Sequence, residues 1–179
     1  MPRPRLRDDA EILDAVGRIA GERGLAWTLA DVAAAAGLSP AALVQRFGSK
    51  HGLLVAFARR SAAASLARLE AAGAAADGPA RDRAVAALLA LTAGVESPAA
   101  LANSVALLHL DLTDPELLAI TRDLFAGLEE RLGALVGPET ARALLTAWNG
   151  SLITWAVRRE GPLPTWVARD LRATLRPAE

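Results

Sequence analysis

The side chains that could perform acid–base or metal chemistry are few in this chain. Its 179 residues include two histidines, His51 and His109, and no cysteine. There is therefore no disulfide, thiolate ligand or thiol nucleophile, and the two histidines do not form the H-x-x-x-H pair of a helical zinc site. Asp111, Asp114 and Glu116 follow His109, but they surround an expected helix start, where acids interact favourably with the helix dipole. We expect no catalytic residue, no metal site and no cofactor, in a protein that is not an enzyme.

Residues 29–48, LADVAAAAGLSPAALVQRFG, have the pattern of a helix-turn-helix. Two short helices cross steeply in this motif, so a small residue must lie where they touch, and Ala33 occupies that position. The connecting turn needs a residue that tolerates a positive φ, and Gly37 provides it. The residues expected to face inward are Leu29, Val32, Ala36, Leu38, Leu43 and Phe47. The pattern favours a DNA-binding motif over an ordinary helical hairpin.

The second helix of this motif would enter the major groove of double-stranded DNA with its N-terminus first. Its expected exposed positions are Ser39, Pro40, Ala41, Ala42, Val44, Gln45 and Arg46. The chain has no net charge, but residues 1–60 carry nine basic side chains against six acidic ones, and residues 61–179 carry eleven against fourteen. This small positive excess permits contact with phosphates without establishing it.

The elements that position these residues are all expected to be helices. Ala, Leu, Arg and Glu dominate, and no alternating run of β-branched residues is long enough for a strand. The first helices are expected over about 8–23, 28–37 and 39–47, with a long fourth helix from residue 50. Thr28 and Asp31 approximate a capping box, and Ser49 can cap the fourth helix.

Glycines and prolines divide the remainder of the chain. Gly73, Gly78 and Pro79 are expected to interrupt the fourth helix. Prolines mark the starts of five further helices, expected near 80–95, 98–109, 115–135, 138–159 and 163–175. We therefore expect an all-α fold with an amino-terminal three-helix helix-turn-helix head, residues 1–60, and a larger helical body, residues 61–179.

The amino terminus, MPRPRLRDDAEIL, has basic residues but not the apolar segment of a secretory signal. No apolar run approaches the ~18–20 residues that cross a bilayer, so we expect a cytoplasmic protein with no membrane partner. Arg3, Arg5 and Arg7 form a basic arm. The arm could contact the minor groove or phosphates, or it could be a solvated tail.

The stretch ILDAVGRIAGERGLAWTLADVAAAAGLSPAALVQRFGSKHGLLVAF resembles the amino-terminal domain of the tetracycline-repressor-like (TetR) family of transcriptional regulators. The resemblance covers about residues 8–57, and its most specific part is residues 43–50. It implies an all-helical homodimer that binds a palindromic operator. It also implies that the body is a ligand-binding and dimerisation domain, and that a small molecule relieves repression.

The resemblance assigns roles by position in the head. It implies that Thr28 donates to a backbone phosphate and that Lys50 binds another phosphate beside a helix N-terminus. Ser39, Ala41, Ala42 and Gln45 would face base edges. Gln45 is suited to adenine and the two alanines to thymine methyl groups. Val44 stands where the family commonly has an aromatic residue, often Tyr, so a hydroxyl that contacts phosphate is lost, and Arg46 could compensate for it.

An apolar stripe recurs at helical spacing in the expected helix 138–159. It comprises Leu144, Leu145, Trp148, Leu152 and Trp155, and the last expected helix adds Leu171 among other apolar residues. The resemblance implies that these two helices pair with their counterparts in a dimer, through Leu144, Leu152, Trp155 and Leu171. The alternative is that the stripe belongs to the core of a single chain.

A few polar residues stand among apolar ones in the body, which is the expected form of a ligand site. The candidate ligand-binding residues are Asn103, Leu107, His109, Phe125, Trp148 and Asn149. The alternative for His109 and Asn149 is a purely structural role. We expect a repressor that a small apolar or weakly polar effector releases from DNA. The rival hypothesis, left open by Val44, is a helical scaffold whose head no longer binds DNA.

Overall fold

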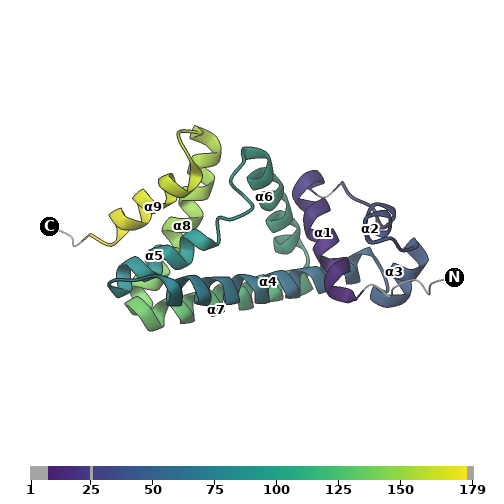
Figure 1. Cartoon of the computed structure of the whole chain (residues 1–179), viewed down its shortest axis with the longest axis horizontal. Helices are drawn as coiled ribbons and strands as arrows, with labels where there is room; N and C mark the ends of the chain where they lie inside the picture. The colour runs from purple at the N-terminus through teal and green to yellow at the C-terminus, as the bar shows by residue number, and fades with distance from the viewer. Residues whose placement is uncertain (1–7, 25, 177–179) are drawn as a thin grey trace.

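The computed structural model describes residues 8–24 and 26–176, and these residues form α-helices and no strands (Figure 1). The helices are α1 (Asp9–Arg23), α2 (Leu29–Ala36), α3 (Pro40–Phe47), α4 (Lys50–Ala75), α5 (Ala80–Ala90), α6 (Pro98–Thr113), α7 (Pro115–Val136), α8 (Pro138–Arg158) and α9 (Leu163–Thr174). The all-α prediction is confirmed. No helix in these ranges combines the length and apolar character needed to cross a membrane. The basic arm with Arg3, Arg5 and Arg7 lies outside the described residues.

The helices divide into a small head and a larger body. Helices α1, α2 and α3 lie together at one end of the molecule, and α4 runs from them along α7 toward α5, α8 and α9 (Figure 1). Helix α6 lies between α1 on one side and α7 and α8 on the other. Helices α4 and α6 therefore connect the head to the body.

Side-chain caps begin the helices of the head as their sequence predicts. The Thr28 hydroxyl accepts from the Asp31 backbone N–H, and the Asp31 carboxylate accepts from the Thr28 backbone N–H, which completes the capping box. Gly37 ends α2 in the left-handed region, with φ 66° and ψ 35°. Ser39 and Ser49 cap α3 and α4 by accepting from backbone N–H groups three residues later. These local hydrogen bonds define where α2, α3 and α4 begin.

Two large hydrophobic clusters and a small third one, with Val55, Leu117 and Ile120, form the core of the described residues. The head cluster contains Ile12, Val16, Trp27, Val32, Ala33, Leu43 and Leu53 among its buried members. The body cluster is built mainly from α5, α7, α8 and α9, with Leu69 from α4. Because α4 supplies Leu53 to one cluster and Leu69 to the other, it is a continuous helix across the boundary that we predict near residue 60.

Three expected helix bounds differ from the structure. Helix α4 continues through Gly73 to Ala75, because Gly73 is buried where α4 packs on α5 and a Cβ there would lie 3.4 Å from the Ala87 Cβ. The prediction that Gly73 interrupts the fourth helix is therefore wrong. Helix α5 ends at Ala90 rather than near 95, and α6 extends to Thr113 rather than 109.

Candidate DNA-binding face and ligand cavities

Helix α3 presents an exposed face above a buried anchor. Leu43 is completely buried, whereas Val44 is 43% exposed and Gln45 is also exposed. The Gln45 side chain forms no hydrogen bond with the described residues, so its amide is available to a base edge. Ser39, Pro40, Ala41 and Arg46 are exposed as predicted, and Ala42 is half-buried rather than exposed, because it lies nearer the side of α3 that faces the head core.

Thr28 lies at the start of α2, where its hydroxyl is engaged by Asp31. The hydroxyl oxygen accepts from the Asp31 N–H at 3.3 Å, and the hydroxyl donates to the Asp31 carboxylate at 2.7 Å. The hydrogen bonds that the Thr28 hydroxyl and backbone N–H donate to the carboxylate lower the pKa of Asp31, and Arg23 at 2.8 Å adds to this effect. A phosphate that accepts from the Thr28 hydroxyl would therefore compete with Asp31 for the same proton.

Lys50 lies against Trp27 at the start of α4. Its Nζ donates to the Trp27 carbonyl oxygen and lies 4.4 Å from the centroid of the indole ring. Trp27 itself is buried in the head core. The contact holds the ammonium group beside the N-terminus of α4, where N–H groups and the helix dipole favour an anion. Sequence reasoning missed Trp27, because the two residues are 23 positions apart and no local pattern joins them.

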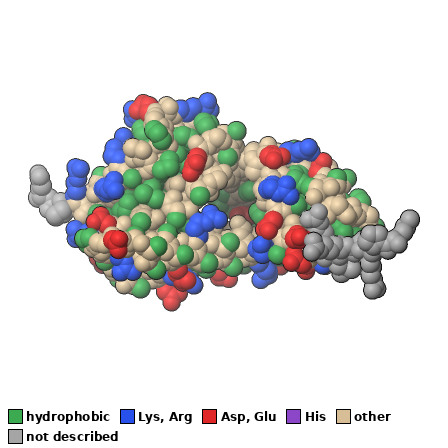
Figure 2. Space-filling view, in the orientation of Figure 1, with side chains coloured by type: hydrophobic (Ala, Val, Ile, Leu, Met, Phe, Trp, Pro, Cys, Tyr) green, Lys and Arg blue, Asp and Glu red, His purple; other side chains and the backbone are tan. Residues whose placement is uncertain are grey.

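Arg46 also has a partner within the head. Its guanidinium forms an ion pair of 2.9 Å with Asp9 of α1. The pair links the exposed end of α3 to the first helix and leaves the guanidinium close to the predicted reading face. On the face of the molecule seen in Figure 2, acidic and basic side chains are intermixed over head and body alike. This intermixing agrees with the zero net charge of the chain.

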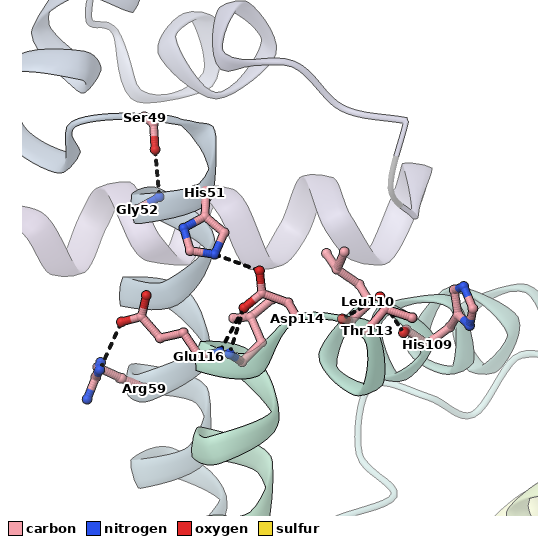
Figure 3. A network of polar contacts seen from close by, with 10 residues as sticks. Ser49, His51, Gly52, Arg59, His109, Leu110, Thr113, Asp114 and Glu116 are labelled. Carbon is pink, nitrogen blue, oxygen red and sulfur yellow. Dashed lines mark hydrogen bonds and ion pairs between the residues drawn. The ribbon is translucent and has the colours of Figure 1, made fainter.

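A polar contact joins the start of α4 to the start of α7 (Figure 3). His51 Nε2 lies 2.9 Å from a carboxylate oxygen of Asp114, and Arg59 lies 3.2 Å from Glu116. The other Asp114 oxygen caps α7, accepting from the Glu116 and Leu117 N–H groups at 3.0 Å. The pKa of Asp114 is lowered chiefly by the hydrogen bond from the Leu117 N–H and then by His51. Asp114 and Glu116 stand at the start of α7 as expected, whereas Asp111 lies in the last turn of α6, and Asp114 also contacts the head.

Helix α6 makes a second connection between body and head. The Asn103 side-chain amide donates to the Gly21 carbonyl oxygen at 2.7 Å, and Gly21 lies in the last turn of α1. Leu107 packs against the head cluster one turn further along α6. Asn103 therefore faces the head and lines neither hollow, whereas Leu107 packs on the head and also lines a hollow between α4, α6 and α7. His109, another predicted ligand residue, is exposed to solvent.

A hollow of about 320 Å³ lies between α6, α7 and α8, and we call it the body cavity. Its lining is Ser65, Leu91, Leu101, Ser104, Val105, Leu108, Leu124, Phe125, Leu128, Trp148, Asn149, Leu152 and Ile153. The lining includes Phe125, Trp148 and Asn149 of the predicted ligand residues and no charged side chain. The Asn149 amide donates to the Leu145 carbonyl oxygen at 2.9 Å. The buried indole N–H of Trp148 has no hydrogen-bond partner among the described residues.

The four predicted dimer residues lie in the interior of a single chain. Leu144 and Leu171 are completely buried, Trp155 is 4% exposed and Leu152 is 8% exposed. All four belong to the body cluster, because the stripe faces the neighbouring helices of the same chain. This burial favours the alternative, in which the stripe belongs to the core of a single chain.

Comparison with known proteins gives the head a family. Residues 12–57 match the model of a family described as bacterial regulatory proteins, tetR family. No curated protein is similar enough in sequence to match. The matched residues run from α1 through the helix-turn-helix into α4. The match therefore confirms the resemblance seen in the sequence.

Solved structures share the fold over almost the whole chain. A transcriptional regulator from Rhodococcus sp. Rha1 is 22% identical, with a TM-score of 0.76 and 94% of each chain covered. A member of the TetR family from Streptomyces coelicolor A3 is 22% identical, with a TM-score of 0.71, over 94% of this chain and 98% of that one. The multidrug binding protein EbrR, complexed with imidazole, is 23% identical, with a TM-score of 0.69 over 97% of each chain.

Identities this low show a shared fold and not a shared ligand. The matched family and the first two of these relatives are described as regulators rather than as enzymes. The helix-turn-helix head and the helical body occur together in one chain, as the sequence predicts. Residues 12–57 therefore match bacterial regulatory proteins of the tetR family, and the described residues share the fold of solved TetR-like transcriptional regulators.

Proposed function

We propose that this regulator is a repressor that binds a palindromic operator as a homodimer and that a small apolar or weakly polar effector releases it. The observation that carries the proposal is the position of α6 between the body cavity and the head. Leu101 and Leu108 of α6 line the cavity, whereas Asn103 and Leu107 of the same helix contact the head. A ligand that displaces α6 would therefore act directly on the end of α1.

The lining of the body cavity supports the class of effector. With no charged side chain in the lining, a charged ligand would lose its hydration without gaining an ion pair. Asn149 and Ser104 supply polar atoms. The Trp148 ring can turn toward a ligand acceptor without breaking a hydrogen bond, since its N–H has none with the described residues. EbrR has been solved with proflavin bound, which supports a ligand-binding role for this fold.

The head supports sequence-specific DNA binding. Ser39, Ala41 and Gln45 are exposed on α3, and we assign base contacts to them, with Ala42 at the edge of the same surface. We assign phosphate contacts to Lys50, beside the N–H groups that begin α4, and to Thr28, with Pro40, Val44 and Arg46 flanking the reading face. Residues 1–60 are proposed as the DNA-binding domain and residues 61–179 as the effector and dimerisation domain.

The outward face of α8 supports a homodimer. Ala143, Thr146, Gly150, Thr154 and Val157 are exposed at spacings of three and four residues, and Val157 is 79% exposed. Small side chains at this spacing let two helices approach closely. We therefore propose that this face, and not the buried stripe, meets the second copy.

Arginine at Gly150 tests the dimer. A Cβ at Gly150 would meet nothing within 4 Å, so Gly150→Arg leaves the single chain intact and blocks the close approach of a second α8. Light scattering should report a dimer for the wild type and for Ala126→Arg, an exposed change on α7, and a monomer for Gly150→Arg. A dimer in all three proteins would exclude this face.

Selection of binding sites from random duplex DNA tests the DNA-binding proposal. We expect an enriched palindrome whose half-sites lie about one helical turn, or a multiple of it, apart. We also expect weak binding to unrelated duplex that falls steeply with salt, because phosphate contacts release counterions. If no sequence is enriched and unrelated duplex shows no salt-dependent binding, the chain is the rival helical scaffold.

The enriched operator then allows a test of release. Neutral lipophilic compounds that raise the melting temperature should weaken operator binding, and Val105→Trp, which fills the body cavity from α6, should abolish both effects. Stabilisation by charged polar metabolites alone would contradict the proposed effector class.

A further inference from the structure

A second hollow, which we call the junction cavity, lies between α4, α6 and α7 and has a volume of about 150 Å³. Its lining is Leu54, Phe57, Ala58, Ser61, Ala62, Leu107, Leu110, Asp111, Leu117, Ile120, Thr121 and Leu124. Leu124 is the one residue of this lining that also lines the body cavity. Leu54, Phe57 and Leu107 also pack against the head cluster, so the junction cavity shares a wall with the head.

The only charged side chain in this lining is Asp111, which is half-buried on α6. One carboxylate oxygen accepts from the Thr121 hydroxyl of α7 at 2.9 Å. No Arg, Lys or His of the described residues forms an ion pair with Asp111. Burial raises the pKa of Asp111, and the nearby Asp114 adds to the rise, although Thr121 opposes it. The fold thus keeps a carboxylate among apolar walls with no positive charge to balance it.

We infer that the junction cavity binds a small organic cation, with an ammonium or amidinium group on Asp111 and an apolar ring or short chain against Phe57 and the leucines. A cation would supply the charge-assisted hydrogen bond that Asp111 lacks. The Phe57 ring can face the positive charge or pack against the apolar part. A cavity of about 150 Å³ with apolar walls holds one benzene-sized group, which limits the ligand to that size.

The simpler reading is that Asp111 only joins α6 to α7 through Thr121. An asparagine would serve that purpose, because its side-chain oxygen can accept the same hydrogen bond without a buried charge. The charge is therefore the feature that a structural clamp leaves unexplained, and it is the feature that a cation requires. The two readings differ in one measurable property, the dependence of ligand affinity on the Asp111 charge.

Calorimetric titration of the full chain near neutral pH separates them, with benzylammonium as the cation and benzyl alcohol as its neutral counterpart. We expect benzylammonium to bind at least about tenfold more tightly, the range expected for one charge-assisted hydrogen bond. Asp111→Asn should reduce its affinity to that of the alcohol. Asp123→Asn, which removes an exposed carboxylate of α7 outside the cavity, should change nothing. Equal binding of the two compounds, no binding of either, or undiminished binding to Asp111→Asn would overturn the inference.

A variant that keeps the carboxylate and removes the space gives a second test. Ala62→Leu projects extra carbons into the junction cavity and should abolish binding of both compounds. If benzylammonium binds this variant as it binds the wild type, the cation is held at the surface and the cavity is not its site.

An effect of the cation on DNA binding rests on the proposed function, whereas the titration does not. Operator binding is therefore measured separately, by fluorescence anisotropy with and without benzylammonium. Because Leu54, Phe57 and Leu107 are shared with the head, we expect the cation to change operator affinity severalfold in the wild type and not in Asp111→Asn. A chain that binds the cation but no operator would refute the repressor and keep the site. A chain that binds the operator but not the cation would refute the cation site and keep the proposed repressor.

Discussion

Beneath α3 the core of the head is filled by buried side chains such as Leu43 and Trp27, whereas α6 borders two hollows between helices. In the head, Thr28 is engaged by Asp31 and Lys50 by Trp27, so the polar groups near the predicted DNA face are held in place. Along α6, cavities of about 320 and 150 Å³ remain between the helices. A surface that must match a rigid duplex gains from fixed side chains, whereas a ligand-responsive domain needs space that folding leaves unfilled.

The largest expected effect comes from removing the anchor of the head. Leu43 is completely buried under α3, so Leu43→Ala should lower the free energy of unfolding by about 2–5 kcal/mol. Leu108→Ala, at the wall of the body cavity where the side chain is 37% exposed, should cost only about 0.5–1 kcal/mol. Urea denaturation followed by circular dichroism measures both. Similar losses for the two variants would show that the body is packed as tightly as the head.

The next effect separates two roles within the head. Lys50→Ala should weaken binding to every duplex and reduce the salt dependence by about one phosphate contact. Gln45→Ala should cost about 1–3 kcal/mol on the operator and little on scrambled DNA. Mobility shifts on both duplexes compare the variants. Equal losses on both DNAs for Gln45→Ala would remove Gln45 from base reading.

The head could be predicted residue by residue because its signals are local. Thr28, Ser39 and Ser49 each cap a helix through N–H groups three residues away, and Gly37 supplies a turn that other residues rarely adopt. Such patterns are written in consecutive positions of the chain. The contact of Lys50 with Trp27 joins residues 23 positions apart, so no local pattern predicts it.

In the body, the predicted helices were mostly right and their faces were often wrong. Helix α6 has apolar residues on all sides, PAALANSVALLHLDLT, so its periodicity does not select the face toward the cavity. Asn103 and His109 were therefore assigned to a site that they do not line. The stripe with Leu144 and Trp155 was correctly seen on α8, but periodicity cannot tell the core of one chain from an interface.

A smaller effect is expected at the link between the two parts. Asn103→Ala removes the hydrogen bond to the Gly21 carbonyl and should lower the free energy of unfolding by about 0.5–1.5 kcal/mol. Hydrogen exchange should rise in the last turn of α1, although the change lies in α6. Thr113→Ala is the control, because its hydroxyl bonds only to carbonyls of its own helix. If both variants leave exchange in α1 unchanged, Asn103 does not connect the cavity helix to the head.

The smallest effect concerns the charge that the body leaves unbalanced. Burial raises the pKa of Asp111 above its ordinary 3.8, so the folded chain keeps this proton to a higher pH than the unfolded chain does. Stability from this group is then complete below about pH 3.8 and is lost as the pH rises through the folded pKa. Asp114, whose pKa is lowered, acts at lower pH and has the opposite sign.

Melting temperatures measured from about pH 4 to about pH 7 test this sign. The wild type should lose stability over that range relative to Asp111→Asn, so the difference between the two proteins should grow with pH. It should stay within roughly 2–4 °C, the shift that corresponds to about 1 kcal/mol in a chain of this size, because a half-exposed carboxylate is well screened. Parallel curves would mean that water already balances the Asp111 charge. The body would then resemble the head in leaving no charged group unsatisfied.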